Sequence, residues 1–128
     1  MIGEIKMLDK KEIKKRYKET LPPMGIYQIK NLVNGKILIG NSKNLTGKSN
    51  SYKFQLNLGS HMNKELQEDY NKFGEENFSF EVIDHLDPKE GVNYDYTKDL
   101  EALEELWIEK LQPFNEKGYN KQKNNSAL

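Results

Sequence analysis

The chain has 128 residues, of which 35% are hydrophobic and 31% charged, and its 20 basic side chains balance 20 acidic ones. This length allows one domain with a single modest core, and the neutral balance is unlike the basic face of a dedicated duplex-DNA-binding protein. The absence of cysteine excludes disulfides, thiolate zinc sites and a cysteine nucleophile.

The N-terminal residues are strongly basic. Residues 1–20 are predicted to form an amphipathic helix, followed by a stiff Pro-Pro connector that ends at residue 23. The cationic side chains of the predicted helix, which include Lys10, Lys14 and Arg16, either contact phosphates or form a solvated helix face. The first residues lack the apolar stretch of a secretory signal, and no apolar run approaches the roughly 20 residues that span a membrane. We therefore expect a cytoplasmic protein.

Two β-like runs, residues 26–33 and 36–40, flank an Asn-Gly pair. This pair is the strongest short-range signal for a β-hairpin. A two-residue turn would put Asn31 opposite Leu38, and the alternation of side chains would put Tyr27 and Leu38 on the same sheet face. We expect that face to form one depression together with Glu104.

The next two segments have helical features. Residues 41–59 are predicted to be helical only in part, because Gly47 and several polar residues weaken the first turns. Residues 62–73 form an amphipathic helix whose apolar stripe begins at Met62 and whose end is marked by Gly74.

The last two elements are a strand and a long helix. Residues 78–83 alternate apolar and polar side chains, as a half-buried strand does. Residues 98–112 show the clearest helical pattern, with Glu104 in the middle of an apolar face formed by Leu100, Leu103, Trp107, Ile108 and Leu111. A buried carboxylate costs several kcal/mol unless it is paired, protonated or bound to a metal. Glu104 is therefore either in an internal salt bridge with a lysine or part of a functional site.

Two further residues have both a structural and a functional interpretation. Lys48 shares a helix face with Tyr52, where its stem either lies along apolar surface or presents a charge to a ligand. The segment around Lys48 is no phosphate-binding P-loop, because residue 42 is a serine where that motif needs a glycine. His61 is either a structural hydrogen-bonding residue or a general base or metal ligand.

Several of these motifs together resemble the GIY-YIG nuclease superfamily. They are GIY at 25–27, LIG at 38–40 with NGK in the turn, and the segments 59–83 and 100–120. The resemblance covers residues 24–120 and implies an α/β (α+β) domain with a three-stranded antiparallel sheet flanked by helices. The expected organisation is a basic helix and connector at 1–23, the GIY-YIG-like domain at 24–120, and a polar tail at 121–128.

The resemblance also implies roles for single residues. Tyr27 matches the tyrosine that acts as general base or positions the attacking water, and Glu104 matches the ligand of a single Mg²⁺ or Mn²⁺ ion. The remaining expected catalytic residues are Lys48, Tyr52 and Asn120, and the expected substrate-binding residues are Lys48, His61, Lys10, Lys14 and Arg16.

The chain departs from the motif pattern at two positions. Leu38 stands where the second tyrosine is expected, and Lys48 stands where an arginine is expected. Leucine supplies no hydroxyl, and lysine lacks the two-pronged fit of arginine to phosphate. The resemblance implies a metal-dependent phosphodiesterase or endonuclease that acts on nucleic acid or a nucleotide, and these two departures lead us to expect weak activity on duplex DNA. The alternative is an inactive binding protein that holds nucleic acid or sequesters a small cyclic nucleotide.

Overall fold

The computed structural model of the chain describes residues 21–89 and 94–122, in which helices flank a three-stranded antiparallel sheet. The predicted α+β class and the three-stranded sheet are confirmed. The elements, in chain order, are β1 (Gly25–Asn31), β2 (Ile37–Ser42), α2 (Leu45–Asn57), α3 (Lys64–Phe73), the short 3₁₀ turn η2 (Glu75–Asn77), β3 (Phe78–His85) and α4 (Thr97–Leu111). The predicted N-terminal helix, with Lys10, Lys14 and Arg16, lies outside the described residues.

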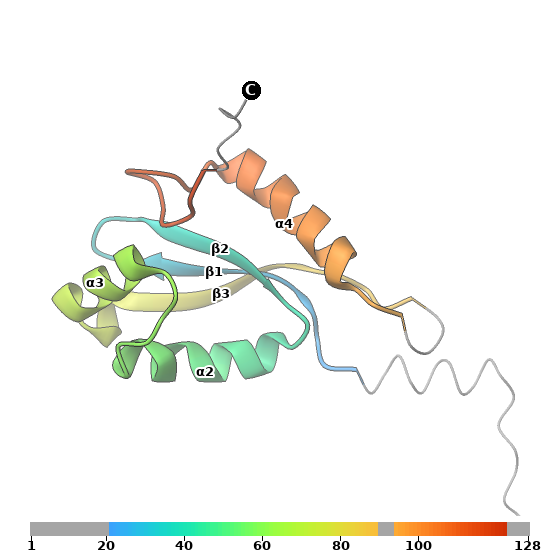
Figure 1. Ribbon diagram of the computed structural model, residues 1–128, viewed down its shortest axis with the longest axis horizontal. Helices are drawn as coiled ribbons and strands as arrows, with labels where there is room; N and C mark the ends of the chain where they lie inside the picture. Colours follow the sequence, from blue (N-terminus) through green and yellow to red (C-terminus); the bar gives the residue numbers. More distant parts are fainter. Residues whose placement is uncertain (1–20, 90–93, 123–128) are drawn as a thin grey trace, which may run out of the picture.

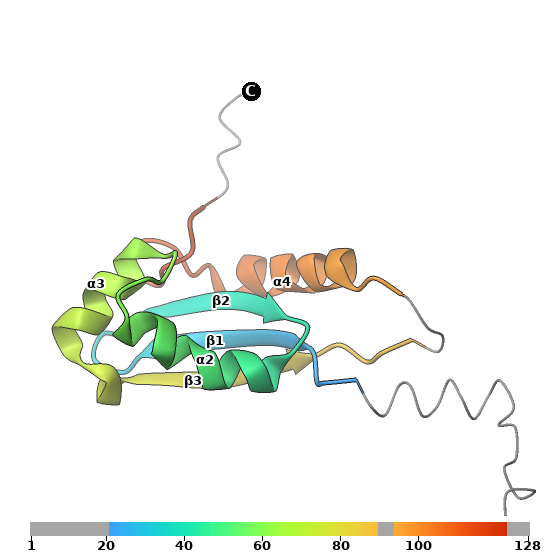
Figure 2. The same cartoon turned by 60° about the horizontal axis from the view of Figure 1, so that its bottom comes forward.

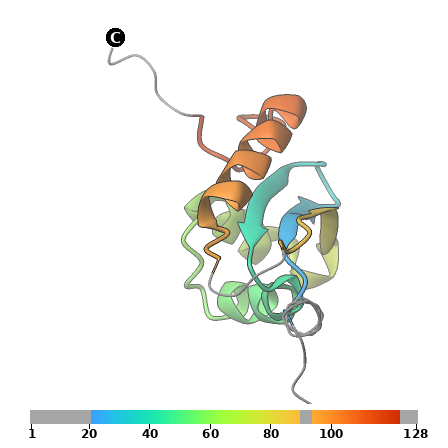
Figure 3. The ribbon, with the colours of Figure 1, turned by 90° about the vertical axis from the view of Figure 1, so that its right-hand side faces the viewer.

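The helices cover the sheet from two sides. The strand order is β2-β1-β3, so β1 is central and β2 is an edge strand. α2 and α3 lie on one face, and α4 lies against β2 on the other (Figures 1 and 2). The end-on view in Figure 3 shows the same separation of α4 from α2. No helix in the described ranges is long and apolar enough to cross a membrane.

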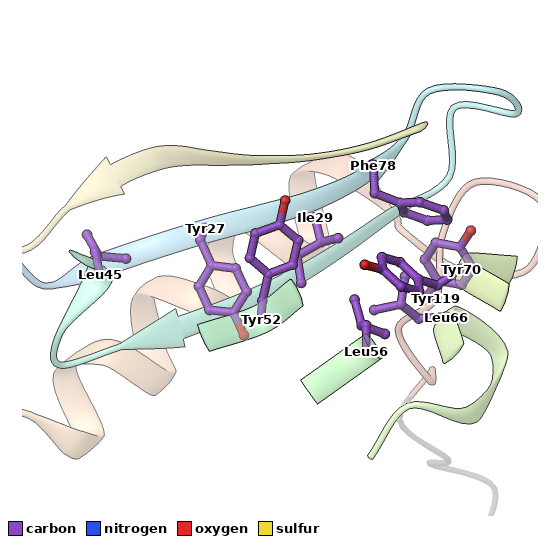
Figure 4. Close-up of a cluster of buried hydrophobic side chains, with 9 residues drawn as sticks. All are labelled: Tyr27, Ile29, Leu45, Tyr52, Leu56, Leu66, Tyr70, Phe78 and Tyr119. Atoms are coloured by element: carbon purple, nitrogen blue, oxygen red, sulfur yellow. The ribbon is translucent and has the colours of Figure 1, made fainter. Parts of the chain in front are cut away.

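The main core lies between the sheet and the pair α2 and α3. Burying its apolar side chains supplies the main driving force for this packing. A smaller cluster of Met24, Tyr96 and Leu100 anchors the start of α4. The main cluster, drawn in Figure 4, contains Tyr27, Ile29, Leu45, Tyr52, Leu56, Leu66, Tyr70, Phe78 and Tyr119.

The predicted two-residue hairpin turn is wrong. Ile29 pairs with Leu38, so the loop spans residues 32–35 and the register differs by two residues from the prediction. The longer loop is stabilised by the side chains of Asn31 and Asn34, which accept hydrogen bonds from the backbone N–H groups of Val33 and Lys36. A shift of two residues leaves every side chain on its original face. The prediction that Tyr27 and Leu38 share a face is therefore confirmed.

The helix boundaries also differ from the predictions. α2 is helical throughout from Leu45, because Asn44 caps it by accepting a hydrogen bond from the N–H of Gly47 at 2.9 Å. α3 begins only at Lys64, after the Asn63 cap. The prediction that Met62 belongs to the apolar stripe is wrong, since its side chain is 96% exposed.

Candidate active site at the edge of β2

Tyr27 lies across the edge strand. It is 6% exposed, and its ring stacks on Phe80 with ring centres 5.0 Å apart. The ring leans over Gly40, its direct partner on β2. A β-carbon at position 40 would stand only 2.5 Å from the Tyr27 hydroxyl oxygen. Glycine at the third position of the LIG motif therefore makes room for the tyrosine.

The surroundings of Tyr27 keep its hydroxyl protonated. Burial raises the pKa of Tyr27 to about 12, and the negative charge of Glu104 contributes to the increase. The phenol is therefore neutral at physiological pH and able to donate a hydrogen bond.

Glu104 approaches β2 from the opposite face. It is half-buried on α4, and its Oε1 accepts a hydrogen bond from Nδ2 of Asn41 at 3.1 Å. Burial raises the pKa of Glu104, and the hydrogen bond from Asn41 opposes that increase. None of the ion pairs among residues 21–89 and 94–122 involves Glu104. The salt bridge to a lysine, one of the two alternatives for Glu104, is therefore absent from this part of the chain.

Asn120 pairs with the free edge of β2. Its Nδ2 donates to the carbonyl of Ile39 at 2.9 Å, and its Oδ1 accepts from the N–H of Ile39 at 2.8 Å. The neighbouring N–H of Tyr119 donates to the carbonyl of Ile37 at 2.8 Å. The amide of Asn120 therefore continues the pairing of a strand, and this covers an otherwise open sheet edge.

These contacts fall on three consecutive residues of β2. Asn120 binds Ile39 at the outer edge, Tyr27 covers Gly40 on the face of α2, and Glu104 binds Asn41 on the face of α4. We call this arrangement the β2 edge site. The expected single depression lined by Tyr27, Leu38 and Glu104 is not found, because the edge strand separates Glu104 from the other two.

Sequence reasoning missed Asn41, the hydrogen-bond partner of Glu104. Asn41 pairs with Ile26, so its side chain lies on the opposite face from Tyr27 and Gly40. The position of Asn41 directly after the LIG motif, together with the alternation of side chains in the hairpin, could have placed Asn41 on this face. Recognising Asn41 as the partner of Glu104 would also have required knowing that α4 packs on the same face.

Lys48 and His61 lie on the α2 side of the site. The Nζ of Lys48 is 5.8 Å from the ring centre of Tyr27, so its stem crosses the apolar face and its charge lies beside the phenol. Burial lowers the pKa of His61, and the positive charge of Lys48 lowers it further. The Nδ1 of His61 accepts a hydrogen bond from the N–H of Asn63 at 3.0 Å. An Nδ1 that accepts a hydrogen bond favours the neutral imidazole with its proton on Nε2.

Tyr52 and Leu38, both singled out by the motif resemblance, contribute no polar group to the β2 edge site. Tyr52 is buried against Phe80 at 5.3 Å between ring centres, and its hydroxyl points in the opposite direction from that of Tyr27 (Figure 4). Burial raises the pKa of Tyr52, with a further contribution from Glu75, which lies away from Glu104. Leu38 packs against the main core cluster, and its side chain supplies no hydrogen-bonding group.

The space next to Glu104 is compatible with a hydrated divalent cation. Glu104 and Asn120 line a pocket of about 520 Å³ between α4 and the segment that follows it. In the described part of the chain, no group of three or more histidine or acidic side chains is arranged to hold a metal. Mg²⁺ usually keeps several waters and takes one or two carboxylates together with substrate phosphate oxygens. A single half-buried carboxylate beside such a pocket fits this pattern.

The charges of the described residues do not form a general basic surface. Acidic side chains outnumber lysines in residues 21–89 and 94–122, and the single arginine of the chain is Arg16. Affinity for duplex DNA rises with the number of cationic contacts to phosphate. Among the described residues, the cation placed over the ring of Tyr27 is the ammonium group of Lys48.

Comparison with solved structures identifies the fold. The structure is similar to two structures of the catalytic domain of the homing endonuclease I-TevI, also described as an intron endonuclease, one of which carries a glutamate-to-alanine mutation. The mutant is 29% identical and covers 77% of this chain and 92% of its own, with a TM-score of 0.63. The other is 28% identical and covers 78% of this chain and 99% of its own, with the same TM-score.

Comparison with protein-family profiles and with curated protein sequences gives no match. The similarity to the two endonuclease structures nevertheless extends over most of the described domain. The chain therefore has a GIY-YIG-like fold, as its motifs predict.

Proposed function

We propose that the chain is a divalent-metal-dependent phosphodiesterase or endonuclease whose reaction takes place at the β2 edge site. The observation that carries this proposal is the meeting of Tyr27 and Glu104 at adjacent residues of one edge strand, Gly40 and Asn41. A neutral phenol, a half-buried carboxylate and a nearby ammonium group are a suitable set for phosphodiester hydrolysis. The similarity to an endonuclease catalytic domain also supports it.

In this mechanism Tyr27 orients the attacking water. A phenol whose pKa is about 12 is a poor general base at neutral pH but a good hydrogen-bond donor. Of the two roles that the motif resemblance implies for Tyr27, positioning of water is therefore favoured. Phe80 stacks on the ring and Gly40 lies beneath it, so the hydroxyl is held in one direction.

Lys48 binds the scissile phosphate and stabilises the charge that develops on it. Its ammonium group is a point charge, so it orients the phosphate less strictly than the expected arginine would. Glu104 would hold the Mg²⁺ or Mn²⁺ ion, which when bound polarises the phosphate and stabilises the leaving oxygen. Asn120 keeps β2 in place through Ile39, so its contribution is to shape the site.

The missing hydroxyl at Leu38 favours a second candidate function. A chain that has lost this group and the arginine at position 48 retains a pocket but lacks two groups that its motif pattern leads us to expect. Such a chain would bind nucleic acid or a small cyclic nucleotide without cleaving it. The excess of acidic side chains in the described residues favours a short or small ligand over a long duplex.

Cleavage assays distinguish these functions. The full chain is incubated with Mg²⁺ or Mn²⁺ and duplex DNA, single-stranded DNA or RNA, or cyclic dinucleotides, with Glu104→Ala as the control. We expect slow metal-dependent cleavage that Glu104→Ala abolishes, and little activity on duplex DNA. Binding without cleavage that survives Glu104→Gln would instead establish the second function.

A further inference from the structure

A single row of side chains crosses the sheet beneath α4. Asn41 on β2 pairs with Ile26 on β1, and Ile26 pairs with Asp84 on β3. Directly paired residues lie on the same face, so the three form one row. Ile26 is fully buried in the middle, and the two ends of the row are polar.

Each polar end of this row binds one residue of α4. Asn41 donates to the carboxylate of Glu104 at 3.1 Å, and the indole Nε1 of Trp107 donates to Oδ2 of Asp84 at 2.8 Å. Glu104 and Trp107 are three residues apart and therefore lie on the same side of the helix. The helix is thus attached to the sheet at both edge strands.

A β-bulge brings Asp84 into this row. Tyr27 pairs with Val82 and Ile26 pairs with Asp84, so Ile83 is an extra residue on β3. In a continuous register Asp84 would face Gly25 and lie on the side of Tyr27, away from α4. The extra residue therefore places the acceptor within reach of Trp107.

Trp107 is suited to this contact because its indole N–H is a donor only. Its ring is half-buried, and the Nζ of Lys110 lies 4.8 Å from the ring centre. With Asp84 fixed on β3, the hydrogen bond restricts both the rotation and the sliding of α4 over the sheet. The same restriction applies to Glu104, which lies one turn earlier on the helix.

We propose that Asp84, acting through Trp107, is a positioning residue that sets where the Glu104 carboxylate stands beside Asn41 and its pocket. The inference rests on the proposed function in so far as Glu104 holds the metal there. The bulge on β3, the edge strand opposite β2, thereby contributes to the geometry of the β2 edge site.

The test compares Asp84→Ala, which removes the acceptor, with Asp84→Asn, which keeps a side-chain oxygen in its place. The matched control is Glu81→Ala, which removes another carboxylate from β3, one that accepts an exposed hydrogen bond from Gln28. The readouts are the NMR signal of the Asn41 side-chain amide in the full chain, and kcat and KM for whichever substrate the wild-type chain cleaves. Trp107→Phe removes the donor and serves as a second variant if Asp84→Ala does not fold.

We expect Asp84→Ala to shift the Asn41 amide signal and to lower kcat by about 10- to 100-fold with little change in KM, as for loss of a supporting group around a metal ligand. Asp84→Asn should restore both, and Glu81→Ala should change neither. An Asn41 signal unchanged in both Asp84→Ala and Trp107→Phe would overturn the proposal. If the wild-type chain cleaves no substrate, the proposed activity fails, but the Asn41 signal still decides the positioning role.

Discussion

The ring of Tyr27 covers Gly40 so closely that the hydroxyl oxygen would stand 2.5 Å from a β-carbon at position 40. Gly40→Ala must therefore displace the ring, at a cost of about 1–3 kcal/mol for an overpacked site. We expect lower thermal stability and a loss of any cleavage activity. In a double-mutant cycle with Tyr27→Leu, the stability effects should be less than additive, because leucine vacates the space that the alanine needs. Additive effects would show that the ring does not occupy this position.

Glu104→Gln is expected to separate activity from stability. It removes the charge that would hold a metal, so cleavage should fall by about 100-fold or more. The amide is close in shape to the carboxyl group and can still accept the hydrogen bond from Asn41. Because the variant has no charge to bury, we expect it to be more stable than the wild type at pH 7.

The pH dependence of stability checks the same substitution. The pKa of Glu104 is raised by folding, so its contribution to stability is fully present below the unfolded pKa and is lost as the pH rises through the folded pKa. The advantage of Glu104→Gln should therefore be small in acid and grow towards neutral pH. Denaturant unfolding at a series of pH values measures it. If the wild type and the variant had the same free energy of unfolding at every pH, the burial of this charge would be contradicted.

Leu38→Tyr restores the hydroxyl that the motif pattern leads us to expect, but it introduces a ring beside the main core cluster. Overpacking should lower stability by about 1–3 kcal/mol. If the chain is active with a substitute for that hydroxyl, the variant should be no more active than the wild type. If the site is only degraded, Leu38→Tyr combined with Lys48→Arg should gain metal-dependent cleavage.

The matched control for this pair is Leu38→Phe with Lys48→Arg, which adds a ring of similar size without the hydroxyl. A gain shared by both combinations would show that the hydroxyl is not responsible. Activity is measured on the same substrates as for the wild type, after confirming that each variant is folded.

Asn120→Ala should act mainly on stability. Both the donor and the acceptor of its amide are used by the backbone of Ile39, so the substitution leaves two groups of an edge strand without partners. We expect a loss of about 1–3 kcal/mol, measured by denaturant unfolding. Asn120→Asp keeps the acceptor but loses the donor, so its effect should be similar or smaller. Full stability with abolished activity would instead indicate direct contact with substrate.

Deletion of residues 1–20, here called the basic arm, tests whether these residues contact phosphates. The described domain has more acidic than basic side chains, so phosphate contacts from this arm would dominate the electrostatic part of binding. We expect weaker nucleic-acid binding and a flatter salt dependence, with the slope changing by about 0.9 for each lost contact to duplex DNA. Replacing Lys10, Lys14 and Arg16 by glutamine should reproduce part of the effect. Binding that is unchanged in both variants would assign the arm to a solvated surface.

Within the described residues, the local pattern of the sequence was enough to predict where the strands and the long last helix lie and the faces of the hairpin. Alternation put Tyr27 and Leu38 on one face, and a helical period put Glu104 within an apolar stripe. Such predictions succeed because side-chain periodicity depends only on backbone geometry. The hairpin register failed because it depends on which backbone groups Asn31 and Asn34 bind within the loop, and several turns suit the same residues.

The sequence by itself determined the class of fold and pointed to three of the groups that meet at β2. The helical pattern singled out Glu104, and the resemblance to the GIY-YIG nuclease superfamily implied Tyr27 and Asn120 as well. Only the tertiary structure decided that they contact three consecutive residues of β2 from three directions. It also decided that Tyr52 points elsewhere and that Asp84 reaches Trp107. The reason is physical: the bulge on β3 and the packing of α4 join segments far apart in the chain, and no local period encodes such contacts.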